Sequence, residues 1–312
     1  MVRPVTVKFG VHAGPQMCTM AELQAVWQAA ESLGFDWVSI WDHFYPAPSP
    51  LDGDCFEAVA CHAALAATTE RVRVGSLVYS AGYRHPAVLA NAATTIDHLS
   101  NGRLELGMGA GWHVWEYEAY GIPFEPAAVR LRRMAEAIEV VRLLWTQETT
   151  SYDGEFFTLK EARCNPKPVQ RPPRIWVGAS GEKLALRLAG RLGDGWNVPF
   201  VSPEDFGRKR DIVLANAPSP DRLEVGVNLS YVDAPSGGVL DALKKRFGPA
   251  GEYMVDTVLA GDADTIGARV QEYVDAGAGW IILALRAPFE LEALARFAAQ
   301  VMPRFSGPST GS

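Results

Sequence analysis

Short apolar runs and longer segments of helical periodicity alternate along the chain almost from end to end. The short runs are rich in Val, Ile, Leu and Trp, which is typical of buried strands. The longer segments place apolar residues three or four positions apart, and that spacing predicts amphipathic helices. The predicted strands cover residues 5–12, 36–41, 72–78, 102–109, 174–180, 193–198, 223–232 and 279–285. The predicted helices cover residues 20–34, 56–68, 86–99, 130–145, 182–191, 203–215, 263–276 and 289–302.

Eight strands, each followed by a helix, are the elements of a (β/α)8 TIM barrel, which is an α/β fold. A doubly wound sheet also alternates strands and helices, but eight units without a break in composition favour a closed barrel. We therefore expect one domain over residues 1–305 and a disordered tail over residues 306–312.

Two stretches interrupt the alternation and predict insertions in the region of the fourth and fifth strands. A glycine-rich and aromatic excursion, residues 110–124, follows the fourth strand and is longer than an ordinary βα loop. Residues 149–173 read as a hairpin around Asp153-Gly154 with a proline-rich connector, ahead of the fifth strand. Residues 237–257 show no regular pattern.

Composition and charge narrow the classes of function. Of the 312 residues, 48% are hydrophobic and 21% are charged, as in a soluble protein with a large core. The net charge of −7 and the absence of blocks of like charge disfavour a nucleic-acid or anionic membrane partner. The chain has no long apolar run of membrane-spanning length, and we expect a cytoplasmic protein. Four irregularly spaced cysteines and the lack of an H-E-x-x-H arrangement give no support for a disulfide framework or a metal site.

Polar residues and glycines follow the predicted strands, and this end of the strands is where a TIM barrel carries its chemistry. Asp42 and His43 end the second strand, and both are costly to bury unless they have partners or a function. His43 is either a structural histidine satisfied by a neighbour or a group that exchanges protons. The turn at residues 178–181 leads from a strand into a helix, a geometry that can present backbone amides to a phosphate.

Aromatic residues also gather at the predicted strand ends. Trp41, Trp112, Trp115 and Trp196 fall at or after these ends, where flat apolar walls would suit a planar ring system. Packing in the core is the equally weighted alternative. The G-x-G-x-G run that starts at Gly107 is a weaker sign of binding, because it lacks the spacing of a dinucleotide fingerprint.

Several motifs together resemble one family. The runs "WDHFYP", "YRHPAVLA", "NGRLELGMGAGWHVWEYEAYGIPF" and "GDGWN" are similar to those of the bacterial luciferase-like flavin and deazaflavin oxidoreductases, in the subgroup that depends on coenzyme F420. The resemblance implies a luciferase-like TIM barrel with coenzyme F420 across its mouth. It implies hydride transfer between the deazaflavin C5 and a small organic substrate. An FMN-dependent monooxygenase is the alternative, and a flavin-binding protein without activity is a third.

The resemblance also implies roles for individual residues. His43 and Glu116 match positions expected to be catalytic. The residues expected to bind the cofactor are Asp42, His43, Ser76, Leu77, Gly109, Ala110, Gly111, Trp112, Gly178, Ala179, Ser180 and Gly181. The family often has a cis peptide bond between residues other than proline, and we expect it at Ser76-Leu77. Members of the family often pair through outer helices, which implies a homodimer.

Three positions depart from the pattern of the family. His113 and Val114 replace an asparagine and an acid that are common in the subgroup. Trp112 stands where the sugar-phosphate dehydrogenase branch has a glutamate that serves as an acid. The departure at Trp112 argues against oxidation of a sugar phosphate.

Overall fold

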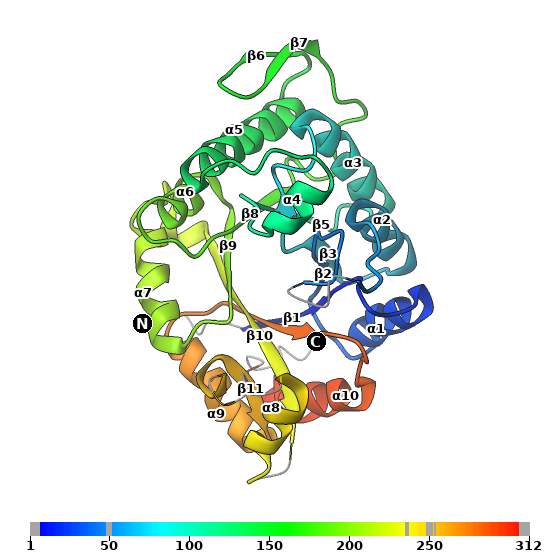
Figure 1. Cartoon of the computed structure of the whole chain (residues 1–312), viewed down its shortest axis with the longest axis vertical. Helices are drawn as coiled ribbons and strands as arrows, with labels where there is room; N and C mark the ends of the chain where they lie inside the picture. Colours follow the sequence, from blue (N-terminus) through cyan, green and yellow to red (C-terminus); the bar gives the residue numbers. More distant parts are fainter. Residues whose placement is uncertain (1–6, 48–51, 235–236, 248–251, 253, 306–312) are drawn as a thin grey trace, which may run out of the picture.

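Eight parallel strands form a closed barrel in the computed structural model, which describes residues 7–47, 52–234, 237–247, 252 and 254–305 (Figure 1). The strands are β1 (Lys8–Ala13), β2 (Trp37–Ile40), β3 (Arg73–Ser76), β5 (Leu104–Gly109), β8 (Arg174–Gly178), β9 (Gly195–Pro199), β10 (Glu224–Asp233) and β12 (Trp280–Leu285). Because β12 pairs with β1, the sheet has no free edge between its first and last strands. The predicted (β/α)8 fold is confirmed.

Helices cover the outside of the barrel and follow the predicted order. They are α1 (Met20–Ser32), α2 (Ala58–Thr68), α3 (Pro86–Leu99), α5 (Ala127–Thr146), α6 (Ala185–Leu192), α7 (Pro203–Leu214), α9 (Ala263–Asp275) and α10 (Leu291–Gln300). Local sequence sets their starts: Thr19 and Glu22 form a capping box on α1, and Pro86 opens α3. No helix among the described residues combines the length and apolar character needed to cross a membrane.

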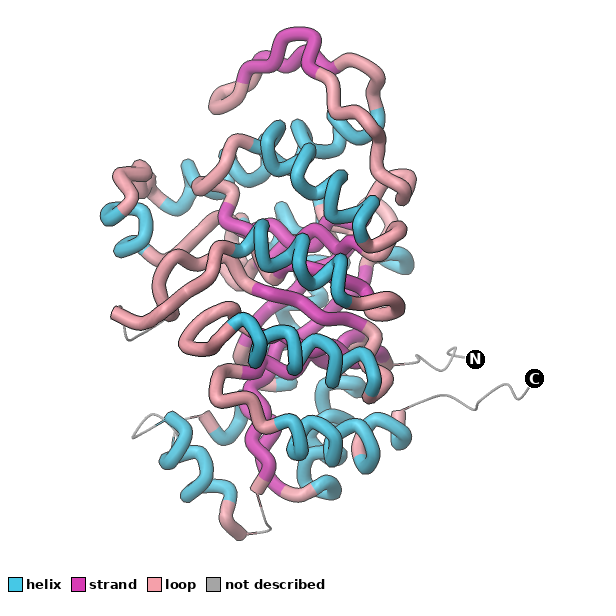
Figure 2. Tube along the Cα trace, turned by 90° about the vertical axis from the view of Figure 1, so that its right-hand side faces the viewer, coloured by secondary structure: helices cyan, strands magenta, loops and turns pink. Residues whose placement is uncertain are grey.

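Both predicted insertions leave the barrel between β5 and β8. The first contains α4 (Val114–Ala119), and the second is an antiparallel hairpin of β6 (Thr150–Asp153) and β7 (Thr158–Ala162). Figure 2 shows this hairpin projecting beyond the helices at one end of the molecule. The expected tail at residues 306–312 lies outside the described residues.

The segment without a predicted pattern contains regular structure. It holds α8 (Val239–Phe247) and a short helix at Val255–Thr257, and it runs into β11 (Val258–Gly261), which pairs with the end of β10. The expectation of irregular structure at residues 237–257 was therefore wrong. Short 3-10 helices also occur at Pro220–Arg222 and Met302–Arg304, and the two-residue strand β4 (Tyr79–Ser80) pairs with β5.

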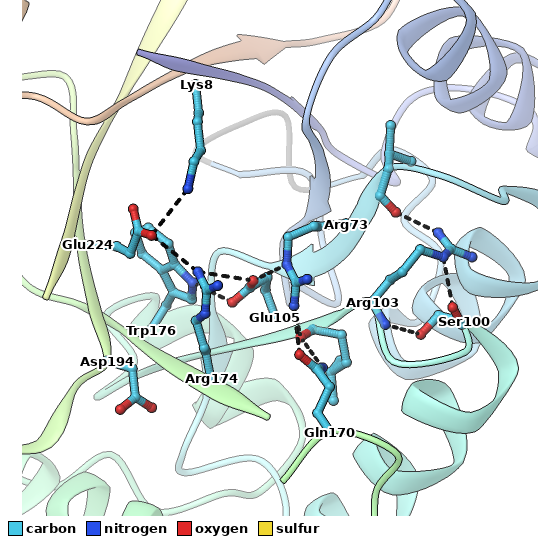
Figure 3. Close-up of polar contacts among 12 residues, drawn as sticks. Lys8, Arg73, Ser100, Arg103, Glu105, Gln170, Arg174, Trp176, Asp194 and Glu224 are labelled. Atoms are coloured by element: carbon cyan, nitrogen blue, oxygen red, sulfur yellow. Dashed lines mark hydrogen bonds and ion pairs between the residues drawn. The ribbon is translucent and has the colours of Figure 1, made fainter. Parts of the chain in front are cut away.

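Tryptophans and ion pairs fill the barrel and close its amino-terminal end. The rings of Trp37, Trp176 and Trp280 pack together inside the barrel. Below them, charged residues from the starts of five strands form a connected network (Figure 3). Trp176 donates a hydrogen bond to Glu105 and Trp280 donates one to Glu224, both at 2.8 Å. This floor leaves the carboxyl ends of the strands as the open side of the barrel.

Burial of one histidine outside the barrel should make stability depend on pH. His62 of α2 is fully buried, and its Nδ1 lies 2.9 Å from the hydroxyl of Tyr79. Burial lowers the pKa of His62 from 6.5 to about 4. The unfolded chain takes up a proton here below about pH 6.5, whereas the folded protein excludes it until about pH 4. Stability is therefore lost as the pH falls through this window, by about 2 kcal/mol at pH 5.

Urea unfolding at about pH 7 and pH 5 measures this dependence. The substitution His62→Gln should reduce the loss of stability on acidification by about 2 kcal/mol. His98 of α3 is exposed, so His98→Gln serves as a control and should leave the dependence unchanged. An identical pH dependence in His62→Gln and the wild type would contradict the interpretation.

Candidate active site

The segment that follows β3 packs into the interior of the barrel. The peptide bond between Leu77 and Val78 is cis, one residue later than the expected position at Ser76-Leu77, which was therefore wrong. The side chain of Val78 lies against glycines of β5 and β8. A Cβ atom added to Gly109 would lie 2.5 Å from Val78 Cγ2, and one added to Gly178 would lie 2.9 Å from Val78 Cγ1. Val78 occupies the space where a side chain at either position would lie, so both positions require glycine.

His43 is held by a carboxylate from the first insertion. Its Nδ1 lies 2.7 Å from Oε2 of Glu116 on α4, although 73 residues separate the two in sequence. The side chain of His43 is 13% exposed, whereas that of Glu116 is completely buried. The imidazole ring is therefore fixed through Nδ1, and Nε2 is the ring nitrogen left for contact with a ligand.

Glu116 accepts hydrogen bonds from four groups. Besides His43, the backbone amides of Phe44 and Tyr45 donate to Oε1, and the hydroxyl of Tyr83 donates to Oε2 at 2.6 Å. Burial alone would raise the pKa of Glu116, but the hydrogen bonds from His43 and Tyr83 and the charge of His43 outweigh it and hold this pKa below its ordinary value. The side chain is an ionised carboxylate beneath His43 and has no exposed surface through which to touch a substrate.

Asp42 points toward the segment after β3 and ties two strand ends together. Its Oδ2 accepts hydrogen bonds from Nη1 of Arg84 at 2.7 Å and from the amide of Ser80 at 2.9 Å. Burial raises the pKa of Asp42 above its usual value, and the guanidinium of Arg84 opposes that rise. The hydroxyls of Ser80 and Tyr117 lie 2.6 Å apart, and this contact links the residues bound to Asp42 with α4.

The open side of His43 is lined by further aromatic and basic groups. The ring of Trp112 is 60% exposed and meets the His43 ring edge to face, with centroids 5.5 Å apart. His113 is buried and packs against both rings. His12 is buried at the end of β1, and its Nδ1 lies 2.9 Å from the hydroxyl of Ser39. Burial, with the positive charges of Arg286 and His43, lowers the pKa of His12 to about 3, so this histidine is neutral.

The remaining residues selected from the sequence differ in their placement. Ser76 is fully buried and exchanges hydrogen bonds with the backbone of Gly107, and Leu77 packs with the tryptophans of the barrel interior. Both face the core instead of the open mouth. Trp196 was expected at the mouth, but its ring is buried and stacks on Phe206 of α7, outside the barrel.

The turn after β8 lies where the sequence placed it. Gly178 ends β8, Ala179 is nearly buried, and Ser180 and Gly181 are exposed ahead of α6. The carbonyl of Ser180 accepts a hydrogen bond from Lys209, which anchors the turn. Ala110 and Gly111 follow β5 on the neighbouring strand, so these two glycine-containing segments border the same part of the mouth.

Sequence reasoning did not select several residues that build the site. Tyr83, Arg84, Tyr117 and His12 hold or flank His43, Asp42 and their loops, as described above. Tyr83 and Arg84 belong to a run that carried the family resemblance, but nothing in that run shows which groups they contact.

Comparison with known proteins decides the family. A sequence model described as luciferase-like monooxygenase matches residues 5–236. The chain belongs to this family. Membership confirms the family that the sequence motifs predicted.

Curated relatives of this luciferase-like protein include dehydrogenases and a reductase. The chain is 35% identical over 193 residues to an F420-dependent glucose-6-phosphate dehydrogenase of Microbacterium testaceum, an alignment that covers 62% of this chain and 56% of the relative. A protein of the same name from Amycolatopsis mediterranei is 28% identical over 96% of this chain and 98% of its own length. A 5,10-methylenetetrahydromethanopterin reductase of Archaeoglobus fulgidus is 36% identical over 64% of this chain and 55% of the relative.

Solved structures share the luciferase-like barrel. An F420-dependent secondary alcohol dehydrogenase in complex with an F420-acetone adduct superposes with a TM-score of 0.84 at 20% identity, covering 97% of this chain and 100% of the other. The monooxygenase RslO1 of Streptomyces bottropensis superposes with a TM-score of 0.79 at 21% identity, over 96% of this chain and 100% of the other. At these identities the likeness establishes the fold alone.

Gly111 should be essential for the link between Asp42 and α4. Its backbone has φ +78°, and a Cβ atom would lie 2.0 Å from the Tyr117 hydroxyl. We expect Gly111→Ala to lower the free energy of unfolding by about 3 kcal/mol, because a clash adds to the penalty for a left-handed residue. Gly121 has φ +67° and open space around it, so Gly121→Ala carries only the backbone penalty of about 1 kcal/mol. Equal losses of stability in the two variants, measured by urea unfolding, would refute the role of the clash.

Proposed function

We propose that this chain is a coenzyme F420-dependent oxidoreductase that moves a hydride between C5 of the deazaflavin and a small organic substrate. The observation that carries the proposal is the pair of His43 and Glu116, with Nδ1 of His43 fixed by a buried carboxylate and the ring edge left at the mouth. The names of the relatives support the choice of coenzyme F420.

The described residues fit a planar tricyclic group with a phosphate. Trp112 offers a flat, largely exposed face beside His43, and Ser180 and Gly181 leave an exposed turn at the start of α6. We infer that Trp112, Ala110 and Gly111 pack along the ring system and that the backbone of residues 178–181 binds the phosphate. When bound, the deazaflavin accepts or supplies the hydride at C5.

The protein's own part in the reaction is a proton transfer. Hydride removal from an alcohol leaves a proton on its oxygen, and Nε2 of His43 is the base that takes it. In the opposite direction the protonated His43 gives that proton to a carbonyl oxygen. Glu116 is a positioning residue: it fixes the Nδ1–H tautomer and stabilises the imidazolium. Asp42 positions the neighbouring loop through Arg84 and Ser80.

Trp112 favours an alcohol or carbonyl of moderate polarity as the substrate. The apolar ring stands where the sugar-phosphate branch was expected to have an acid, and it lies beside the proton-transferring histidine. We further propose that the protein works in the cytoplasm as a homodimer, which rests on the resemblance to its family.

Anaerobic turnover tests this function. The purified protein is mixed with oxidised F420 and one substrate at a time: a secondary alcohol, an aldehyde hydrate or glucose 6-phosphate. The visible absorbance of the cofactor is recorded in each mixture. Bleaching with an alcohol and little with the sugar phosphate is the expected result. Oxygen consumption with reduced FMN, in place of any F420 turnover, would instead support the monooxygenase alternative that the family name suggests.

A further inference from the structure

His113 is a buried histidine that the proposed proton transfer does not involve. It is the N-cap residue of α4, and its side chain is only 4% exposed. Its ring meets two neighbours at steep angles, with the centroid 5.6 Å from that of His43 and 4.9 Å from that of Trp112. Within the residues that the structure describes, its buried Nδ1 has no hydrogen-bond partner. A buried ionisable nitrogen without a partner requires an explanation.

The unpartnered nitrogen lies beside the carboxylate oxygen that holds His43. Nδ1 of His113 is 3.6 Å from Oε2 of Glu116, and Nδ1 of His43 is 2.7 Å from the same atom. Local structure fixes this approach, because the amide of Glu116 donates a hydrogen bond of 3.1 Å to the backbone carbonyl of His113. One buried carboxylate therefore has two imidazole rings beside it.

The two contacts with Glu116 differ in kind. At 2.7 Å, His43 forms a hydrogen bond with the carboxylate, whereas 3.6 Å is too long for a hydrogen bond and the contact of His113 acts through charge. A proton on either ring is attracted by the carboxylate and repelled by a proton on the other ring. The three side chains therefore titrate as a coupled unit, in which the carboxylate stabilises one excess proton.

Other titratable or charged side chains lie near this unit, on the segments around it: Tyr83, Cys55, Asp42, Arg84, His12 and Arg286. The hydroxyl and the thiol are neutral, because burial and the neighbouring carboxylate raise the pKa values of Tyr83 and Cys55. Asp42 forms an ion pair with Arg84 at 2.7 Å, so these two charges cancel. His12 is neutral, and the second arginine keeps its proton. Near neutral pH, the changes of charge in this described part of the mouth fall to His43 and His113.

We propose that His113 is a positioning residue that keeps His43 ready to accept a proton. His113 competes for the one excess proton that Glu116 stabilises, so His43 releases its proton more readily than it would beside the carboxylate alone. The inference rests on the proposed function, in which Nε2 of His43 takes the proton of an alcohol. No atom of His113 joins that transfer, but His113 sets the fraction of His43 in the basic form. The site therefore favours oxidation of its substrate over reduction.

NMR titration of the ring nitrogens, in the protein without cofactor, tests the coupling independently of turnover. The protein carries isotope-labelled histidine, and the signals of His43 and His113 are assigned by their loss in single variants. The substitution His113→Phe keeps a ring against Trp112 and removes the charge. It should raise the midpoint of the His43 titration by about one pH unit, because the competing charge is gone. His113→Asn is smaller and does not titrate, so it should have the same effect without the risk of overpacking.

Kinetics supply a second readout that a merely structural role would not move. In both His113 variants, the acidic limb of the kcat profile for alcohol oxidation should move to higher pH by the same amount. The rate of carbonyl reduction should not fall, because a larger fraction of His43 carries the proton that reduction requires. His98 is exposed on α3, so His98→Gln serves as the control and should change neither the profile nor the titration of His43.

The outcomes separate this inference from the proposed function. An unchanged titration of His43 in both His113 variants, or equal losses of rate in both directions without a moved limb, would overturn the role of His113. A shifted titration in a protein that turns over no F420 would support the coupled pair of histidines and reject the proposed function.

Discussion

Replacing His43 with alanine should lower kcat by about 10²- to 10⁴-fold while changing the Kd of the cofactor by less than about threefold. The imidazole is partly exposed at the mouth, and Glu116 already orients it through Nδ1. In the proposed arrangement the cofactor is held by several other groups, with Trp112 along the ring system and the turn after β8 at the phosphate. A general acid or base contributes to the transition state more than to ligand binding, so the loss should fall on turnover.

The variant His43→Asn provides the matched comparison. Its side-chain amide can still donate to Glu116 from near the position of Nδ1, but it cannot exchange a proton at neutral pH. We expect it to keep the stability of the wild type within about 1 kcal/mol and to be as slow as the alanine variant. Turnover close to that of the wild type in either variant, measured with saturating cofactor, would reject proton transfer by His43.

The substitution Glu116→Gln should lower kcat by about 10²-fold or more, although the side chain never reaches the substrate. The amides of Phe44 and Tyr45 require an oxygen on one side, so the NH2 group of glutamine must face His43. His43 must then accept a hydrogen bond at Nδ1 and carry its proton on Nε2. This is the wrong tautomer for taking a proton from an alcohol.

The pH profile separates this positioning role from a merely structural one. The pKa of Glu116 in the folded protein is lowered from 4.5. The ionised carboxylate therefore makes its full contribution to the free energy of unfolding above about pH 4.5, and this contribution is lost as the pH falls through the lowered pKa. The wild type should therefore keep the His43 tautomer throughout the neutral range. The glutamine variant should lose the limb of the kcat profile that reports a base. The variant Tyr83→Phe, which removes one of the four donors, should lose less than about tenfold in kcat. An unchanged profile in Glu116→Gln would contradict the positioning role.

The sequence predicts the barrel well because its elements are set by local patterns. The period of apolar residues defines the eight strands, and local signals such as the N-cap Thr19 and the first-turn Pro86 define helix starts. The order of strands then brings Asp42, His43 and the turn at residues 178–181 to one end of the barrel. Residue type and position along the chain are sufficient for that part of the site.

Contacts between distant segments cannot be predicted in the same way. The pairing of His43 with Glu116 depends on how α4 folds back over the loop after β2. Trp196 and Asn197 are adjacent and face opposite sides of β9, and the pattern does not say which one faces the interior; Asn197 does, with a hydrogen bond to Asn228. From the sequence, the glycines of β5 resemble a binding loop. In the structure they leave room for the side chain of Val78, which lies on another segment. In each case the decisive partner lies on another strand or helix.

Parallel titration with coenzyme F420 and FMN, without oxygen, tests the central claim most directly. The claim is that this luciferase-like barrel holds a deazaflavin beside His43 as a hydride carrier. We predict saturable binding of F420, detected as quenching of its fluorescence. Its affinity should be at least about tenfold higher than that of FMN. A preference for FMN, or the absence of binding by either ligand, would contradict the account.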